Sequence, residues 1–145
     1  MAEKKPQTFA NHGRLDPLFH FVVLPVFLLT ALAGAVHFVW KPSWHSAAFF
    51  VIAVAAAIAV TKTRLYALKV QDRVIRLEER LRLSLLLPEP LRSRIPELTE
   101  GQLIALRFAS DAEVPKLTEL AISGKMSKAD IKKAIQVWRP DYFRV

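Results

Sequence analysis

Histidines have the widest chemical range of the side chains in this sequence, because an imidazole can bind a metal, ligate haem or move a proton. His37 and His45 lie on either side of a short corner between two apolar runs, and together could bind a metal or a haem. His20 would lie about 25 Å from His37 along one helix and cannot share a ligand with it. The simpler interpretation, which we favour, is that these histidines are hydrogen-bonded or solvated at an interface.

Other catalytic and cofactor signatures are absent from the sequence. It has no cysteine, which excludes disulfides, thiolate catalysis and cysteine-bound metals. Motifs for haem attachment, zinc proteases, nucleotide phosphates and serine hydrolases do not occur, and all glycines are isolated: Gly13, Gly34, Gly101 and Gly124. No acidic residue in the apolar runs could form a proton relay. We therefore expect a protein that is not an enzyme, with no catalytic residue, no cofactor and no metal site.

Two apolar runs would have to position any site. Residues 18–40 and 44–61 contain no Asp, Glu, Lys or Arg. At about 1.5 Å per residue, the first run is long enough to cross a bilayer as a helix and the second is just sufficient. Trp40 and Trp44 flank the corner between them, residues 41–43, and aromatic rings favour the headgroup level. The pattern predicts a transmembrane helical hairpin, because a loop inside the hydrocarbon would leave backbone groups unpaired.

The first predicted helix follows a polar N-terminal segment, residues 1–17. Asp16 is a natural N-cap, and Pro17 suits the first helical position. Pro25 lies inside the run, removes one backbone hydrogen bond and is expected to bend the helix. Thr30 and Gly34 form a small-xxx-small pair that would let another helix approach closely.

The distribution of basic residues predicts an orientation for the hairpin in a chain of net charge +8. Lys4, Lys5 and Arg14 precede the first helix, a basic segment follows the second, and the corner carries only Lys41. The positive-inside rule therefore predicts that both termini are cytoplasmic and the corner external. An alternative is a cleaved signal peptide that ends at residues 33–35, Ala-Gly-Ala, although the apolar run continues beyond them.

Residues 62–87 contain no helix breaker, so the second helix is expected to continue as a charged cytoplasmic stalk. Its wet faces offer i,i+4 ion pairs from Asp72 to Arg76 and from Glu78 to Arg82. An apolar stripe with alternating spacings of three and four, typical of a coiled coil, contains Ala53, Ala56, Val60, Thr63, Ala67, Val70, Val74, Leu77 and Leu81. This stripe packs either against the protein's own first helix and terminal domain or in a parallel homo-oligomer. Both arrangements remain open.

The end of the chain has the pattern of a small all-α domain, residues 99–145, after a proline-containing linker, residues 88–98. Thr99, Ser110 and Ser127 predict the starts of three short helices. Gly124 is expected just beyond the second helix, and the apolar spacing extends the third helix to Trp138. The domain is too small to be robust alone, so it is expected to dock on the stalk or on a second copy.

Several short blocks carry a resemblance to a known family: NHGR (11–14), PLFH (17–20), DRVIRLEE (72–79), IALRFASD (104–111), IKKAI (131–135) and WR (138–139). In this order and spacing they resemble an uncharacterised family of small bacterial membrane proteins with two transmembrane helices. The resemblance covers nearly the whole chain. It implies a bacterial membrane protein and supplies no catalytic residues.

We therefore expect a multi-pass protein of the bacterial inner (plasma) membrane that presents a small helical interaction domain to the cytoplasm. Its expected partners are the lipid bilayer, a second copy bound through the stalk, and an unidentified protein. One alternative is an accessory subunit of a larger membrane complex. Another is a membrane-tethered nucleic-acid binder, but no base-reading pattern accompanies the basic residues near the C-terminus, so nucleic acid is an unlikely partner. Those residues are Lys125, Lys128, Lys132, Lys133, Arg139 and Arg144.

Overall fold

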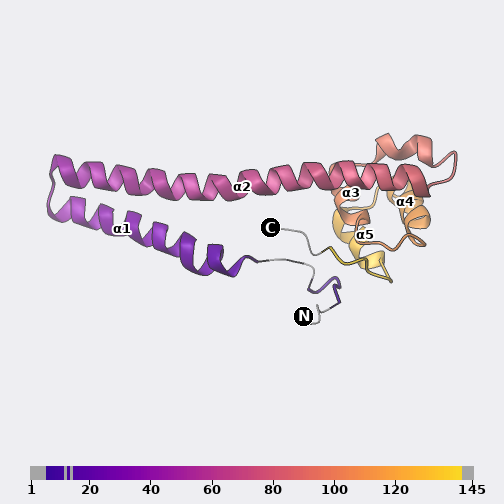
Figure 1. The fold of residues 1–145 in the computed structure, drawn as a ribbon, viewed down its shortest axis with the longest axis horizontal. Helices are drawn as coiled ribbons and strands as arrows, with labels where there is room; N and C mark the ends of the chain where they lie inside the picture. The colour runs from indigo at the N-terminus through magenta and orange to yellow at the C-terminus, as the bar shows by residue number, and fades with distance from the viewer. Residues whose placement is uncertain (1–5, 12, 14, 142–145) are drawn as a thin grey trace. The chain divides into compact units, whose positions relative to one another are not determined.

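The computed structural model describes residues 6–11, 13 and 15–141, and their regular elements are helical, as predicted for an all-α chain. They are η1 (Phe19–Val23, a π-helix), α1 (Leu24–Trp40), α2 (Trp44–Leu86), η2 (Arg92–Glu97, a 3-10 helix), α3 (Glu100–Leu106), α4 (Val114–Ser123) and α5 (Lys128–Ala134) (Figure 1). The chain divides into a hairpin unit, residues 15–69, and a terminal unit that holds the described residues from 70 onward and residues 6–11. Lys4, Lys5, Arg14 and Arg144 lie outside the described residues.

The first helix begins where the sequence predicted. The backbone N–H of Phe19 donates to Asp16 Oδ1 over 3.1 Å, and helical backbone starts at Pro17. The effect of Pro25 is visible as the π-helical turn η1 just before it, in which the Leu24 N–H donates to the Phe19 carbonyl. A regular α-helix would press the proline ring against the carbonyl of Phe21, and the wider π turn relieves that clash.

Gly34 is the point of close approach in the hairpin unit, where α1 and the first part of α2 lie side by side (Figure 1). A Cβ on Gly34 would lie 3.3 Å from the ring of Phe49 and 3.3 Å from the Cα of Phe50. The small-residue prediction is thus confirmed at Gly34. Thr30 is exposed in the hairpin unit, and its hydroxyl donates to the Val26 carbonyl of its own helix.

The corner of the hairpin is closed by serine hydroxyls that the sequence analysis did not single out. The Ser46 hydroxyl is buried and donates to the Lys41 carbonyl over 2.8 Å. The Ser46 N–H donates to Ser43 Oγ and the Ser43 N–H donates to Ser46 Oγ, so the two residues cap the start of α2 reciprocally. The corner can therefore be short, because its polar groups bond to one another.

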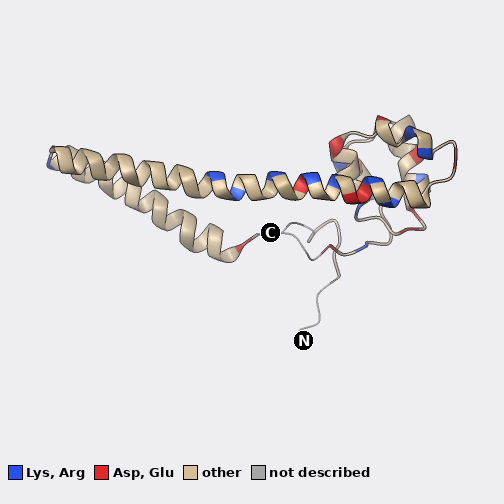
Figure 2. Cartoon of the chain, turned by 45° about the horizontal axis from the view of Figure 1, so that its top comes forward, with Lys and Arg blue, Asp and Glu red and all other residues tan. Residues whose placement is uncertain are grey.

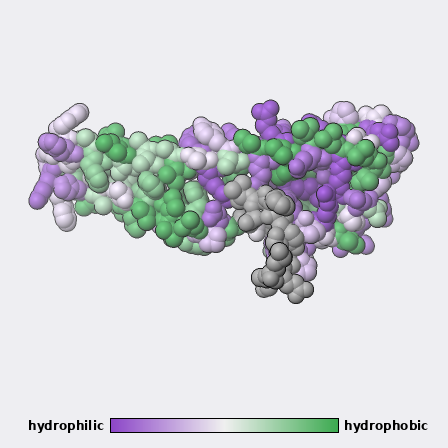
Figure 3. All heavy atoms as spheres, viewed as in Figure 1, coloured by the Kyte–Doolittle hydropathy of each residue, from purple (hydrophilic) through white to green (hydrophobic). Residues whose placement is uncertain are grey.

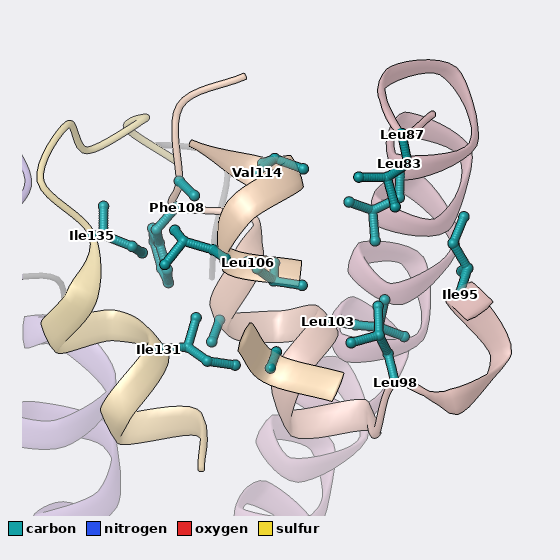
Figure 4. Packing of buried hydrophobic residues seen from close by; sticks show 14 residues of the cluster. Leu83, Leu87, Ile95, Leu98, Leu103, Leu106, Phe108, Val114, Ile131 and Ile135 are labelled. Atoms are coloured by element: carbon teal, nitrogen blue, oxygen red, sulfur yellow. The ribbon is translucent and has the colours of Figure 1, made fainter. Parts of the chain in front are cut away.

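The core of the terminal unit forms where the end of α2 meets the shorter helices. α2 is a single helix that ends at Leu86, and its Leu83, like the following Leu87, is fully buried. The other labelled core side chains in Figure 4 are Ile95, Leu98, Leu103, Leu106, Phe108, Val114, Ile131 and Ile135. This shared core covers apolar faces that the short helices could not bury alone.

Two of the three predicted helix starts are confirmed and one is wrong. Thr99 and Ser127 each form a complete capping box. Ser110 does not begin α4, which starts at Val114 and so places Pro115 near the helix start, where proline is tolerated. Gly124 is the C-cap with φ −87°, and the left-handed residue is Lys125 with φ 46°.

The prediction that the third helix extends to Trp138 is wrong, because α5 ends at Ala134. Glu113 accepts hydrogen bonds from the N–H groups of Gln136 and Val137 over 2.9 and 3.1 Å. The Arg139 N–H donates to the Phe108 carbonyl, beside a bridge that pairs Trp138 with Ala109. These partners replace the i→i−4 bonds of a longer helix. Trp138 still reaches the core, with its ring 5.2 Å from that of Phe108.

Candidate functional site

The hairpin unit has an apolar surface with few buried positions. The helices Phe19–Trp40 and Trp44–Leu86 are long and apolar enough to cross a membrane. Only 6% and 17% of their apolar windows are buried, which is unlike the core helix of a soluble protein. Figure 3 shows hydrophobic side chains gathered over α1 and the first part of α2, and Figure 2 shows Lys and Arg on the later turns of α2.

The histidines His20, His37 and His45 have different surroundings in the structure. His20 Nδ1 lies 2.8 Å from the Asp16 carbonyl and serves the start of the first helix. His37 and His45 are both exposed, and His37 lines a shallow apolar groove with neighbours from α1 alone. Among the described residues, no group of three or more His, Cys, Asp or Glu side chains could hold a metal ion.

In the terminal unit, one face of α2 is buried and includes a single acidic side chain. Ile75, Glu79, Leu83 and Leu87 are buried and repeat every four residues, so they share one side of the helix and its C-terminal extension. Three of the four are apolar. The fourth, Glu79, is only 3% exposed, and a buried carboxylate requires a partner.

Arg82 is that partner, and it ties α2 to the segment after α3. Its Nη1 donates to Glu79 Oε1 over 3.0 Å. Its Nη2 donates to Asp111 Oδ1 over 2.6 Å and to the Ala109 carbonyl over 2.8 Å, and its Nε also donates to Asp111 Oδ1. We call Glu79, Arg82 and Asp111 the charged junction. Its geometry fixes one rotation of α2 against the terminal helices.

The pKa shifts of the two acidic residues in the charged junction follow from burial and from their pairing with Arg82. Burial raises the pKa of Glu79, although the Arg82 guanidinium acts in the opposite direction. The hydrogen bond from Arg82 lowers the pKa of Asp111. Each nitrogen of the Arg82 guanidinium donates at least one hydrogen bond to Glu79, Asp111 or the Ala109 carbonyl, so the cation is engaged in contacts within the terminal unit.

The predicted i,i+4 ion pairs along the stalk are wrong. Arg82 pairs with Glu79 and Asp111 and not with Glu78, because it points into the junction. Arg76 forms an ion pair with Glu100, and its Nε donates to the backbone carbonyl of Asp72. Both arginines therefore connect α2 to the terminal helices.

The predicted apolar stripe and the docking face of α2 are different surfaces. In the terminal unit the stripe consists of Val70, Val74, Leu77 and Leu81, which we call the seam, and these side chains are 62%, 49%, 60% and 59% exposed. At about 100° per residue, the seam lies on roughly the opposite side of α2 from Glu79. Of the two arrangements left open by the sequence, the one in which the terminal domain covers the seam is therefore wrong. In the hairpin unit, Ala53 of the same stripe is buried.

The basic residues near the C-terminus do not form a uniform binding face. Lys132 is 8% exposed, with its Nζ 5.2 Å from the centre of the Phe108 ring. Lys133 lies over the ring of Phe9. Gln7, from the N-terminal segment, exchanges two hydrogen bonds with the backbone of Asp141, a pairing without a signal in the sequence.

Comparison with curated proteins and with solved structures found no match. A family profile matches the whole chain, residues 1–145, and its description is "Family of unknown function (DUF6526)". The chain therefore belongs to the DUF6526 family of unknown function.

Proposed function

We propose that this protein is an integral membrane anchor, whose hairpin unit spans a bilayer and whose terminal unit is a non-catalytic interaction domain in the cytoplasm. The exposed apolar surface of the hairpin unit carries the proposal. Leu29 and Leu32 of α1 and Ile52 of α2 are each more than 60% exposed. Such area costs about 25 cal/mol per Å² in water and nothing comparable in lipid.

Charge supports the orientation with both termini cytoplasmic. Lys62, Arg64 and Lys69 follow directly after the apolar part of α2, whereas the corner carries Lys41 alone. The pairing of Gln7 with Asp141 in the terminal unit favours placing the two ends of the chain on the same side of the membrane. The plasma membrane of a bacterium is the location that the sequence resemblance suggests.

The polar groups of the terminal unit favour an interaction domain over a catalyst or a nucleic-acid binder. Arg82 of α2 holds the domain through Asp111 and the Ala109 carbonyl. Lys132 packs on an aromatic ring and has little exposed surface for a phosphate. A protein partner, including a larger membrane complex, is therefore the favoured target of the domain.

Alkaline extraction of membranes tests the anchoring. The full chain, produced in bacterial cells, is expected to stay in the membrane pellet in alkaline carbonate and to leave it only with detergent. A peripheral protein that alkali releases serves as the control. Release of this chain by alkali would contradict the proposal. The intact mass of the extracted protein separates the anchor from a cleaved signal peptide, since cleavage would remove the residues up to Ala35.

A further inference from the structure

The seam on α2 is apolar, exposed and placed where the chain's own terminal helices do not cover it. Val70, Val74, Leu77 and Leu81 follow one another at spacings of four, three and four residues. This is the repeat of a coiled coil, in which each apolar side chain fits between four side chains of a facing helix. We propose that the occupant of the seam is a second copy of this chain, bound as a parallel two-stranded coiled coil.

The central heptad of the seam has residue types that favour two strands. The spacing places Val74 and Leu81 at the a positions of the heptad and Val70 and Leu77 at the d positions. A β-branched residue at a followed by leucine at d favours a parallel pair, and Val74 with Leu77 is that combination in the middle of the seam. The small apolar Ala67 continues the pattern at the preceding a position.

The charges beside the seam select the parallel orientation. Arg73 and Arg80 occupy g positions, and Glu78 occupies an e position. In a parallel pair, the g residue of one chain faces the e residue of the next heptad in the other, so Arg73 meets Glu78 of the second copy twice. Antiparallel chains would bring g positions together and place arginines against each other. Arg73 and Glu78 are both exposed, and neither forms an ion pair with another described residue.

The length of the seam decides where the pair is stable. About two heptads are short for a coiled coil in dilute solution, because helix pairing must offset the entropy of association. The parallel orientation of the two chains is argued from the charges alone. The stability of the dimer, in contrast, rests on the proposed membrane anchoring. Two hairpins in one bilayer share a topology and are confined to a plane, which raises their effective concentration.

Disulfide crosslinking in lipid vesicles tests the seam, because the natural chain has no cysteine. Leu77→Cys, at a d position, is expected to crosslink into a dimer within minutes of mild oxidation. Lys69→Cys is the matched control, because Lys69 is also exposed on α2 but lies off the seam. Equal crosslinking at both positions, or none at Leu77→Cys, would overturn the proposal.

Charge reversal then tests the pairing across the seam. In the Leu77→Cys background, Arg73→Glu or Glu78→Arg alone is expected to weaken dimer formation about tenfold, because each places like charges opposite one another. The double variant Arg73→Glu/Glu78→Arg restores the pair with its signs exchanged. Failure of this rescue, with both single variants weakened, would overturn the parallel arrangement.

The extraction experiment keeps this proposal separate from the membrane anchor. A chain that resists alkaline extraction but is a monomer in vesicles would overturn the coiled coil and leave the anchor. A chain that alkali releases, but that crosslinks at Leu77→Cys with charge rescue, would overturn the anchor and support the coiled coil.

Discussion

Replacing Arg82 with methionine is expected to lower the free energy of unfolding of the terminal unit by about 3–5 kcal/mol. Methionine keeps much of the length of the side chain but leaves the Glu79 carboxylate, 3% exposed, without its main partner. The loss also removes the bonds to Ala109 and Asp111. Urea unfolding of the full chain in detergent, followed by Trp138 fluorescence in a Trp40→Phe/Trp44→Phe background, measures the change.

A second substitution, which removes the unpaired Glu79 carboxylate, tests whether that charge causes the loss of stability. In Arg82→Met/Glu79→Gln the buried carboxylate is gone, so a large part of the lost stability is expected to return. In Arg82→Met alone, the pKa of Glu79 rises further above its unfolded value. That variant is therefore expected to gain stability as the pH falls and to lose it as the pH rises through the raised pKa. A loss that neither the second substitution nor lower pH reduces would show that the charged junction is not responsible.

Ile52→Arg is expected to prevent stable insertion of the second membrane span. Ile52 lies in the apolar part of α2 and is 67% exposed. An arginine at the centre of a span costs about 3 kcal/mol of insertion free energy, roughly a hundredfold in the inserted fraction. The fraction of the full chain that remains in the pellet after alkaline extraction measures this change.

Leu85→Arg provides the matched control, because Leu85 lies on the same helix and is 82% exposed but belongs to the terminal unit. This substitution is expected to leave extraction unchanged. If Ile52→Arg and Leu85→Arg behaved alike, the apolar part of α2 would not be in the membrane.

Local signals predicted the helix starts well. Asp16, Thr99 and Ser127 cap helices as expected, because a cap depends on a few neighbouring residues. Ser110 has the same local signature and fails, since its hydroxyl donates to Glu113, whose carboxylate also accepts backbone N–H groups from the end of the chain. These hydrogen bonds from the end of the chain join residues more than 20 positions apart, so no pattern in the local sequence indicates them.

The sequence could not predict which face of α2 the terminal helices would cover. The heptad pattern predicted that the seam is an interaction surface, and an apolar stripe is the natural docking face for an apolar domain. The terminal helices instead use the face with Glu79, because Arg82 neutralises the buried carboxylate and also pairs with Asp111 of the segment after α3. A lone acidic residue among Ile75, Leu83 and Leu87 reads as solvent-exposed until its partners are known.

The topology of the full chain in intact cells tests the central claim most directly. Single cysteines at Pro42, in the corner, and at Lys116, on α4, replace exposed residues of a chain without natural cysteine. A membrane-impermeant maleimide is expected to label Pro42→Cys in intact bacterial cells and to label Lys116→Cys only after the membrane is permeabilised. Labelling of Lys116→Cys in intact cells, with or without labelling of Pro42→Cys, would contradict a hairpin with both ends in the cytoplasm.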